Sequence, residues 1–216
     1  MPLKHDLKYH LYSRWFGKPT WNAAYIFERC VKTLKPGDTV IDAGANLGEV
    51  TEAMAATGAT VHAFEPDPYA FDHLQKRVGH LRNVHLYQKA LSDKTGLVRL
   101  YRAKSFSEDP DLWSQSSSLF ADKSNVTTDG AIDVEQISIL EFVRSIDQPI
   151  RIMKIDVEGA EVPILEAIMS SGLMDRIDRI FAETHEKKIP QLAERTRQIR
   201  NASKARWPGR INLDWH

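Results

Sequence analysis

The chain has 216 residues, and 29 basic side chains balance 29 acidic ones to give a formal net charge of zero. This length and a hydrophobic content of 42% are typical of one globular domain, expected here over residues 1–216, and they exclude wholesale disorder. The zero net charge argues against a generally basic nucleic-acid-binding protein, and the single cysteine, Cys30, excludes an internal disulfide and a cysteine-rich zinc site.

The sequence carries no sign of a membrane anchor. No apolar run approaches the roughly 20 residues of a spanning helix. Residues 1–20, which we interpret as an N-terminal extension, alternate charged and aromatic side chains and lack the apolar stretch of a signal peptide. We therefore expect a cytoplasmic protein without membrane insertion.

The charges are unevenly distributed along the chain. Residues 1–20 and 187–210 are basic, whereas residues 105–135 are acidic. A basic run can bind a polyanion or form a solvated helix face. We interpret 187–210 as the outer face of a helix and expect the acidic segment to lie near the active site.

Hydrophobic periodicity predicts helices and strands that alternate along the chain. Short runs rich in β-branched residues predict strands, and apolar residues at helical spacing predict helices. Asp67 followed by Pro68 predicts a helix start. Strands are expected over 39–43, 60–64, 84–88, 97–101, 132–137, 151–157, 178–184 and 211–215, and helices over 21–34, 50–57, 68–78, 140–145, 162–169 and 189–199.

This alternation predicts an α/β fold with a doubly wound, mostly parallel sheet covered by helices on both faces. Residues 104–130 are rich in Ser and Asp, show no periodicity and are expected to form a long loop. Trp113, Leu119 and Phe120 favour a loop that covers the substrate rather than a disordered insertion. Ligands are expected beyond the carboxyl ends of the strands.

Two carboxylates follow consecutive predicted strands. Asp42 stands at the end of the first, before a turn with Gly44 and Gly48, and it would repel an anionic pyrophosphate but attract a sulfonium or ammonium group. Glu65 follows 23 residues later, near the spacing at which an acidic residue reaches ribose hydroxyls. The alternative for Glu65 is a cap on the following helix. A nucleoside with a cationic tail, S-adenosylmethionine, fits this pair better than NAD.

Four motifs in order resemble those of the FkbM-type methyltransferases, from about residue 35 to residue 186. They are Val40-Ile41-Asp42-Ala43-Gly44-Ala45-Asn46-Leu47-Gly48-Glu49-Val50-Thr51, then Phe64-Glu65-Pro66-Asp67-Pro68, then Asn83-Val84 with Ala90-Leu91-Ser92-Asp93 and Gly96, and finally Lys154-Ile155-Asp156-Val157-Glu158-Gly159-Ala160-Glu161.

The resemblance implies a class I, Rossmann-like methyltransferase fold. It also implies S-adenosylmethionine as cofactor and O-methylation of a hydroxyl on a sugar or small molecule. By position, the methionine part of the cofactor would lie near Asp42, Gly44, Asn46 and Gly48, the ribose near Glu65, and the adenine near Lys89 and Ala90.

The catalytic candidates stand at the ends of two later strands. A neutral alcohol needs a base as the new bond forms, and Asp156 and His185 are expected to orient and deprotonate it. Glu158, at i+2 from Asp156, would face the same cavity. Alternatively, Asp156 caps the next helix, and Glu158 and Glu161 satisfy backbone donors at its start.

Three alternatives remain open at this point. An Asp/Glu/His cluster could bind a divalent cation, although we expect no metal. A nucleic-acid methyltransferase could use the basic 187–210 segment, although no nucleic-acid partner is expected. A non-catalytic binding module could keep the fold, but the intact Asp42, Glu65 and Asp156 argue against that reading.

Overall fold

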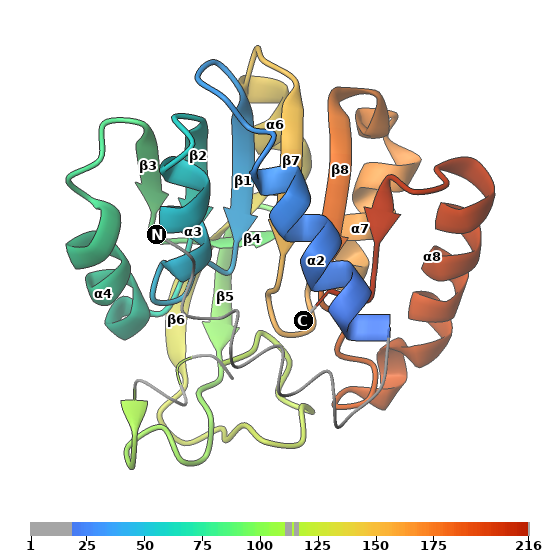
Figure 1. Cartoon of the computed structure of the whole chain (residues 1–216). Helices are drawn as coiled ribbons and strands as arrows, with labels where there is room; N and C mark the ends of the chain where they lie inside the picture. Colours follow the sequence, from blue (N-terminus) through green and yellow to red (C-terminus); the bar gives the residue numbers. More distant parts are fainter. Residues whose placement is uncertain (1–18, 111–113, 115–116, 216) are drawn as a thin grey trace.

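The computed structural model describes residues 19–110, 114 and 117–215. Its central feature is a six-stranded sheet with the order β3-β2-β1-β7-β8-β9, in which every neighbouring pair is parallel (Figure 1). This confirms the doubly wound α/β class. The strands are β1 (Thr39–Ala43), β2 (Thr60–Phe64), β3 (Val84–Tyr87), β7 (Ile150–Ile155), β8 (Ile177–Ala182) and β9 (Ile211–Asn212).

Helices cover both faces of this sheet (Figure 1). On one face α2 and α3 pack on Val40, Val61 and Ile152, and on the other α6 and α7 cover a larger apolar cluster. The helices are α2 (Pro19–Val31), α3 (Glu49–Ala55), α4 (Pro68–Val78), α6 (Ile139–Ser145), α7 (Glu161–Ser170) and α8 (Ala193–Arg206), with 3-10 turns at Leu173–Arg176 and Pro190–Leu192.

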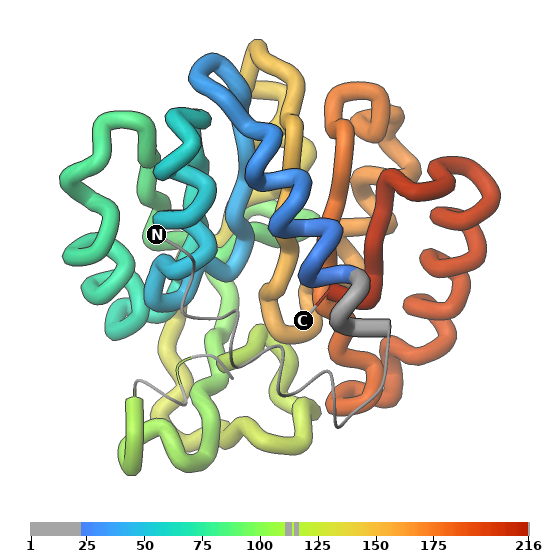
Figure 2. Tube along the Cα trace, in the orientation of Figure 1, coloured from blue at the N-terminus to red at the C-terminus, as the bar shows by residue number. Residues whose placement is uncertain are grey.

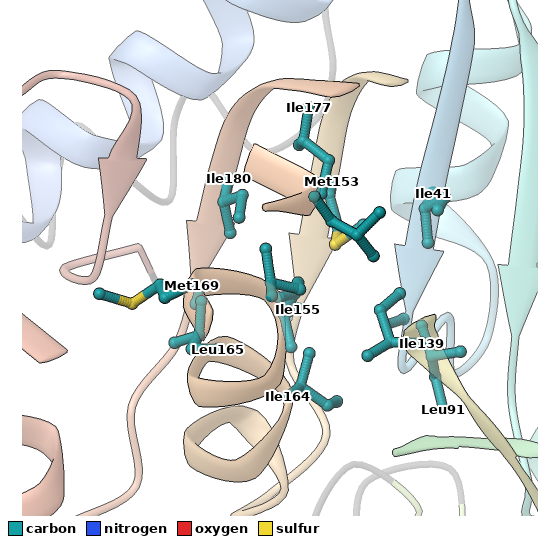
Figure 3. Close-up of a cluster of buried hydrophobic side chains, with 14 of the residues drawn as sticks. Ile41, Leu91, Ile139, Met153, Ile155, Ile164, Leu165, Met169, Ile177 and Ile180 are labelled. Carbon is teal, nitrogen blue, oxygen red and sulfur yellow. The ribbon is translucent and has the colours of Figure 1, made fainter. Parts of the chain in front are cut away.

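The larger core lies between the sheet and α7. Figure 3 shows side chains from β1, β7, β8 and α7, among them Ile41, Met153, Ile155 and Leu165, directed into one cluster. The central strands β1 and β7 are buried almost throughout, as their apolar runs predict for strands covered on both faces. This core holds the carboxyl ends of the central strands in place.

A second, three-stranded sheet with the order β4-β6-β5 extends beyond the carboxyl edge of the main sheet (Figure 1). Its strands are β4 (Ala90–Ser92), β5 (Gly96–Leu100) and β6 (Ile132–Ser138). The sequence predicted β5 and β6 but not β4, because three residues are too few for a periodic signal. β5 runs antiparallel to β6, so the fold as a whole is mostly parallel.

The described parts of the loop, residues 104–110 and 117–130, follow β5 and lie beneath the carboxyl ends of the main strands (Figure 2). Two isolated bridges, Tyr101 to Ser118 and Ala103 to Val126, join its parts to the residues that leave β5. Trp113 and residues 1–18 of the predicted extension lie outside the described residues. The last strand is also shorter than expected, since pairing with β8 ends at Asn212.

Within the described ranges, no helix combines the length and apolar character needed to cross a membrane.

Candidate active site

A cavity of about 260 Å³ lies at the carboxyl ends of β1, β2, β7 and β8. Backbone bonds beyond the strand ends keep these tips aligned: Asp156 N donates to Ala43 O (3.0 Å) and Glu183 N to Ile155 O (3.0 Å). Six residues predicted from the sequence line it, namely Gly44, Asn46, Glu65, Ala90, Asp156 and Glu158, together with Pro66, Leu91, Leu100, Ser114, Ser117, Leu119, Val157, Glu183 and Lys188.

The turn after β1 brings backbone atoms to the cavity. Gly44 adopts φ 78°, and Asn46 adopts φ 46°, a left-handed conformation that asparagine tolerates better than most residues. The Asn46 amide donates to Glu65 Oε2 (2.9 Å), and Ser114 Oγ donates to Asn46 Oδ1 (3.1 Å). The first turn is therefore tied both to the end of β2 and to the 104–130 loop.

Asp42 does not line the cavity but is fully buried beneath it. Its Oδ2 accepts a hydrogen bond from Thr51 Oγ1 (2.6 Å), and its Oδ1 lies 3.4 Å from Lys154 Nζ. Asp42 and Lys154 are register partners on adjacent parallel strands, which explains the pairing. Asp42 therefore acts on the turn through these partners and not from a position on the cavity wall.

Lys154 lies at the site, although the sequence alone assigned it no individual role. Its buried ammonium donates to Gly44 O (2.6 Å) and lies 3.6 Å from Asp156 Oδ2. Burial lowers the pKa of Lys154, but the carboxylates of Asp42 and Asp156 outweigh this effect and raise it above its ordinary value. A lysine between the buried apolar residues Met153 and Ile155 was the available signal.

Glu65 faces the cavity and is 7% exposed. Its Oε1 accepts from Asp67 N (2.8 Å), while the Asp67 side chain caps α4 through Tyr69 N (2.9 Å). The predicted cap at Asp67 is therefore confirmed, and Glu65 does not occupy that position. Burial raises the pKa of Glu65 to about 7, although the backbone amides of Asp67 and Asn46 oppose the rise.

Two further residues expected at the cofactor lie away from the cavity wall. Gly48 has φ 88° at the N-cap of α3, where a Cβ would lie 2.7 Å from Leu74 Cδ1 of α4. The absence of a side chain at Gly48 therefore allows α3 and α4 to pack closely. Lys89 is in an ion pair with Glu135 (2.6 Å), whereas its neighbour Ala90 lines the cavity.

Asp156 and Glu183 present carboxylates at the tips of the adjacent strands β7 and β8. Burial raises the pKa of Asp156 to about 7. The ammonium of Lys154 lowers this pKa, whereas the negative charges of Glu183 and Glu158 raise it further. Asp156 does not cap α7, because the N-cap position is Ala160. It is therefore a cavity carboxyl that gains or loses its proton near neutral pH.

Glu161 satisfies the backbone at the start of α7, as one of the sequence alternatives proposed. Its Oε1 accepts from Val157 N (2.9 Å) and its Oε2 from Gly159 N (2.8 Å). Glu158 differs, because its backbone is left-handed (φ 54°) and its carboxylate forms an ion pair with Lys123 (2.7 Å). The sequence analysis placed Glu158 on the same side as Asp156 by assuming an extended segment, and that extended conformation is absent at Glu158. Glu158 nevertheless lines the cavity.

His185 is 3% exposed and does not line the cavity. Its Nδ1 lies 3.1 Å from Glu161 Oε1 and its Nε2 lies 2.9 Å from Glu158 Oε2. Burial lowers the pKa of His185, but the two glutamates outweigh it and raise the pKa to about 10. A histidine that is already protonated at neutral pH has no lone pair to offer, so this geometry argues against the general-base role expected for it.

A group of potential metal ligands occurs here among the described residues. Donor atoms of Asp156, Glu161 and His185 lie within 4.8 Å of one another. However, both oxygens of Glu161 already accept backbone amides, and the ammonium of Lys154 lies close to Asp156. The arrangement favours a charge-balanced network, so the expectation of no metal is kept as a prediction.

Comparison with known proteins identifies related sequences. Residues 42–206 match the family described as the methyltransferase FkbM domain. The hexuronic acid methyltransferase AglP of Haloferax volcanii is 28% identical over 151 residues, which cover 68% of this chain and 56% of that protein. The 31-O-demethyl-FK506 methyltransferase FkbM of Streptomyces tacrolimicus is 41% identical over 70 residues, covering 31% of this chain and 27% of that protein.

A third relative acts on RNA according to its name. The ribosomal RNA small subunit methyltransferase A of Thermotoga neapolitana is 44% identical over 63 residues, covering 28% of this chain and 24% of that protein. The chain spans less than two thirds of the length of each of these three relatives. The family match extends over most of the chain and includes the strand tips that form the cavity. The protein, whose own sheet is doubly wound and parallel, therefore belongs to the FkbM methyltransferase family, and S-adenosylmethionine is the cofactor of that family.

Proposed function

We propose that this protein transfers a methyl group from S-adenosylmethionine to a hydroxyl of a sugar or another small polyhydroxylated molecule. The observation that carries the proposal is one cavity lined by two carboxyl groups, Glu65 at the end of β2 and Asp156 at the end of β7, to which we assign the cofactor ribose and the acceptor hydroxyl. Cofactor and acceptor can therefore meet in a single space, as methyl transfer requires.

The cavity has a chemical character that fits S-adenosylmethionine. Each oxygen of Glu65 accepts one backbone amide and keeps capacity for a ribose hydroxyl. Pro66, Ala90 and Leu91 offer an apolar surface for adenine. The acidic side chains at the strand tips, Asp156 and Glu183, suit the positively charged sulfonium and ammonium groups of the methionine portion. The bound cofactor supplies an activated methyl group on a sulfonium, so no nucleophilic side chain is needed.

Asp156 is the residue to which we assign the proton transfer. Its pKa of about 7 lies where a general base works best, because the carboxylate is populated at neutral pH and still holds a proton well. Lys154, 3.6 Å away, stabilises the charged form. Glu183 lines the same cavity, and its negative charge raises the pKa of Asp156.

His185 and Glu158 take a different part in this proposal from the one expected. His185 is the protonated centre between Glu158 and Glu161 and holds both carboxylates in position. Burial alone would raise the pKa of Glu158, but His185 and Lys123 lower it to about 2, so it stays ionised. Glu158 thus shapes the acceptor side of the cavity without exchanging a proton.

The acceptor class draws support from the relatives' names. AglP is named a hexuronic acid methyltransferase, and FkbM is named a 31-O-demethyl-FK506 methyltransferase. The first name denotes a sugar acid as acceptor and the second an oxygen that lacks its methyl group. The similarity to each covers only part of the relative. The acceptor of this chain is therefore proposed at the level of a hydroxylated small molecule.

RNA is the second candidate acceptor, favoured by the local similarity to the ribosomal RNA methyltransferase. The basic 187–210 segment is less available for phosphate than its sequence indicates. In α8, Arg195 pairs with Glu166 (2.9 Å), Arg197 with Glu194 (2.8 Å) and Arg200 with Asp214 (2.6 Å). Phosphate binding would give an affinity that falls steeply with salt, and we expect no such dependence.

The test is incubation with methyl-labelled S-adenosylmethionine and a panel of sugars, uronic acids, other polyols and RNA, with products identified by mass spectrometry. We expect label on a hydroxyl of a small acceptor. The variant Asp156→Asn should bind cofactor as the wild type does but lower kcat by about 10² to 10⁴-fold. The wild-type rate should rise with pH through about 7, as Asp156 loses its proton.

Asp178→Asn is the matched control, because Asp178 stands at the opposite end of β8 and pairs with Arg151 at the surface. Unchanged kcat in Asp156→Asn would exclude Asp156 as the base. Transfer to RNA alone would replace the small-molecule proposal.

A further inference from the structure

Lys123 is a buried ammonium contributed by the 104–130 loop. Its side chain is fully shielded from solvent, and its Nζ lies 2.7 Å from Glu158 Oε2. Burial lowers the pKa of Lys123, and the charge of Glu158 opposes this effect. A buried lysine is costly unless it is paired, so the ion pair is a condition for seating this part of the loop.

The carboxylate of Glu158 that pairs with Lys123 also lies near two other basic side chains. His185 Nε2 lies 2.9 Å from the same oxygen, and Lys188 Nζ lies 3.9 Å from it. Glu158 has a left-handed backbone (φ 54°) and lies in the turn between β7 and α7. The Lys123 ion pair therefore joins the loop to the catalytic end of the sheet.

Neighbouring contacts place the same segment on the same turn. Ser118 Oγ donates to Glu158 O (2.5 Å), and Ser124 N donates to Lys188 O (3.4 Å). Phe120 lies against Gly159, where a Cβ would come within 2.9 Å of its ring. Residues 117–124 are thus a wall docked on the turn after β7, and we call this segment the docked wall.

The docked wall brings one unusual hydroxyl to the cavity. Ser117 lines the cavity, and its buried Oγ has no hydrogen-bond partner among the residues that the structure describes. Buried hydroxyls nearly always have a partner, so this one is available to a ligand. Leu119 lines the cavity beside it and supplies an apolar surface.

We propose that Lys123 is a positioning residue for the acceptor: its ion pair with Glu158 seats the docked wall so that the Ser117 hydroxyl binds a second polar group of the acceptor. This inference rests on the proposed function, in which Asp156 faces the hydroxyl that is methylated. It selects acceptors with at least two polar groups, such as sugars, over simple alcohols. Lys123 does not itself touch the acceptor.

The first experiment compares Lys123→Met, which keeps the side-chain length and removes the charge, with Lys123→Arg. Lys94→Met is the matched control, because Lys94 is exposed and lies in the turn between β4 and β5, outside the docked wall. Hydrogen exchange of the amides in 117–124 and the cofactor affinity are measured on the same proteins. We expect faster exchange in 117–124 for Lys123→Met alone, with Lys123→Arg partly restoring protection and the cofactor affinity unchanged.

The second experiment uses Ser117→Ala, a small change that leaves the ion pair intact and guards against a Lys123 variant that fails to fold. With a sugar acceptor, both Ser117→Ala and Lys123→Met should raise KM by about tenfold, as expected for a lost hydrogen bond. With a simple alcohol acceptor, Ser117→Ala should match the wild type.

Unchanged exchange in 117–124 for Lys123→Met would overturn the seating role. Faster exchange with an unchanged acceptor KM would overturn the positioning role. A wild-type protein that binds cofactor but methylates no acceptor would contradict the proposed function instead, and the exchange measurement would still support or overturn the seating of the wall.

Discussion

Gly44 lies against the backbone of Asp156 so closely that a Cβ on Gly44 would stand 1.7 Å from the Asp156 carbonyl oxygen. The two residues belong to the first and the last of the four motifs, more than a hundred positions apart in the chain. Lys154 Nζ reinforces the contact, since it donates to Gly44 O and lies near Asp156 Oδ2. The turn after β1 and the strand tip that carries Asp156 are therefore one structural unit.

Substitution of Gly44 by alanine should disrupt this unit. The new methyl group would meet a backbone oxygen, which cannot move aside as a flexible side chain can, so one strand tip must shift. We expect a large loss of cofactor affinity in calorimetry and a lower Tm. Gly172→Ala is the control, because Gly172 has φ 76° against 78° for Gly44 but nothing within 4 Å of an added Cβ. It should cost only the roughly 1–2 kcal/mol of a left-handed alanine. Equal effects of the two variants would contradict the close-contact argument.

Glu65 should make cofactor binding dependent on pH. Its pKa of about 7 means that the carboxylate form, which accepts ribose hydroxyls, increases as the pH rises through neutrality. Cofactor affinity of the wild type should therefore rise between about pH 6 and pH 8. Glu65→Gln should weaken binding by about 2 kcal/mol and flatten the profile. Titration calorimetry between pH 6 and pH 8 measures the cofactor affinity, with the variant Glu194→Gln, at an exposed position, as control. If Glu65→Gln kept the wild-type dependence of affinity on pH, the assignment of Glu65 to the ribose would be wrong.

His185 should contribute to stability and not to proton transfer. Its pKa is raised from 6.5 to about 10, so its stabilising effect is complete below pH 6.5 and is lost as the pH rises through about 10. His185→Gln should lower the free energy of unfolding by about 3–5 kcal/mol at neutral pH, because it removes the ion-pair partner of the buried Glu161 and one of the cations beside Glu158. The Tm difference from wild type should shrink toward pH 10.

The same variant separates the two base candidates. Where His185→Gln remains folded, the rise of the rate near pH 7 should persist, because it belongs to Asp156. Loss of that rise would return the base role to His185. His80→Gln, an exposed histidine on the turn after α4, is expected to behave as the wild type in both measurements.

Removal of divalent cations should leave the activity unchanged. The ligand group of Asp156, Glu161 and His185 is already occupied by backbone amides and by its own ion pairs. Exhaustive chelation followed by assay and by metal analysis of the purified protein checks this expectation. Activity that is lost on chelation and returns with Mg²⁺ or Mn²⁺ would show that a metal takes part.

Much of this molecule could be read from local sequence patterns. The β-branched run of β1, the cap at Asp67 and the apolar spacing of α7 depend on neighbours in the chain, and the structure confirms each of them. The family motifs likewise located the strand tips, since carboxyl ends of parallel strands meet at one edge of the sheet. β4 escaped prediction because its three residues pair only through tertiary contact with β6.

The chemistry of individual side chains depended on distant partners instead. The sequence by itself determined the α/β fold, the family and a cofactor edge that includes Gly44 and Glu65. Only the tertiary structure decided that His185 lies between two glutamates and that Lys123 forms an ion pair with Glu158. The reason is physical: hydrophobic period and turn chemistry are properties of a short segment, whereas a pKa or a buried ion pair is set by charges that folding brings together.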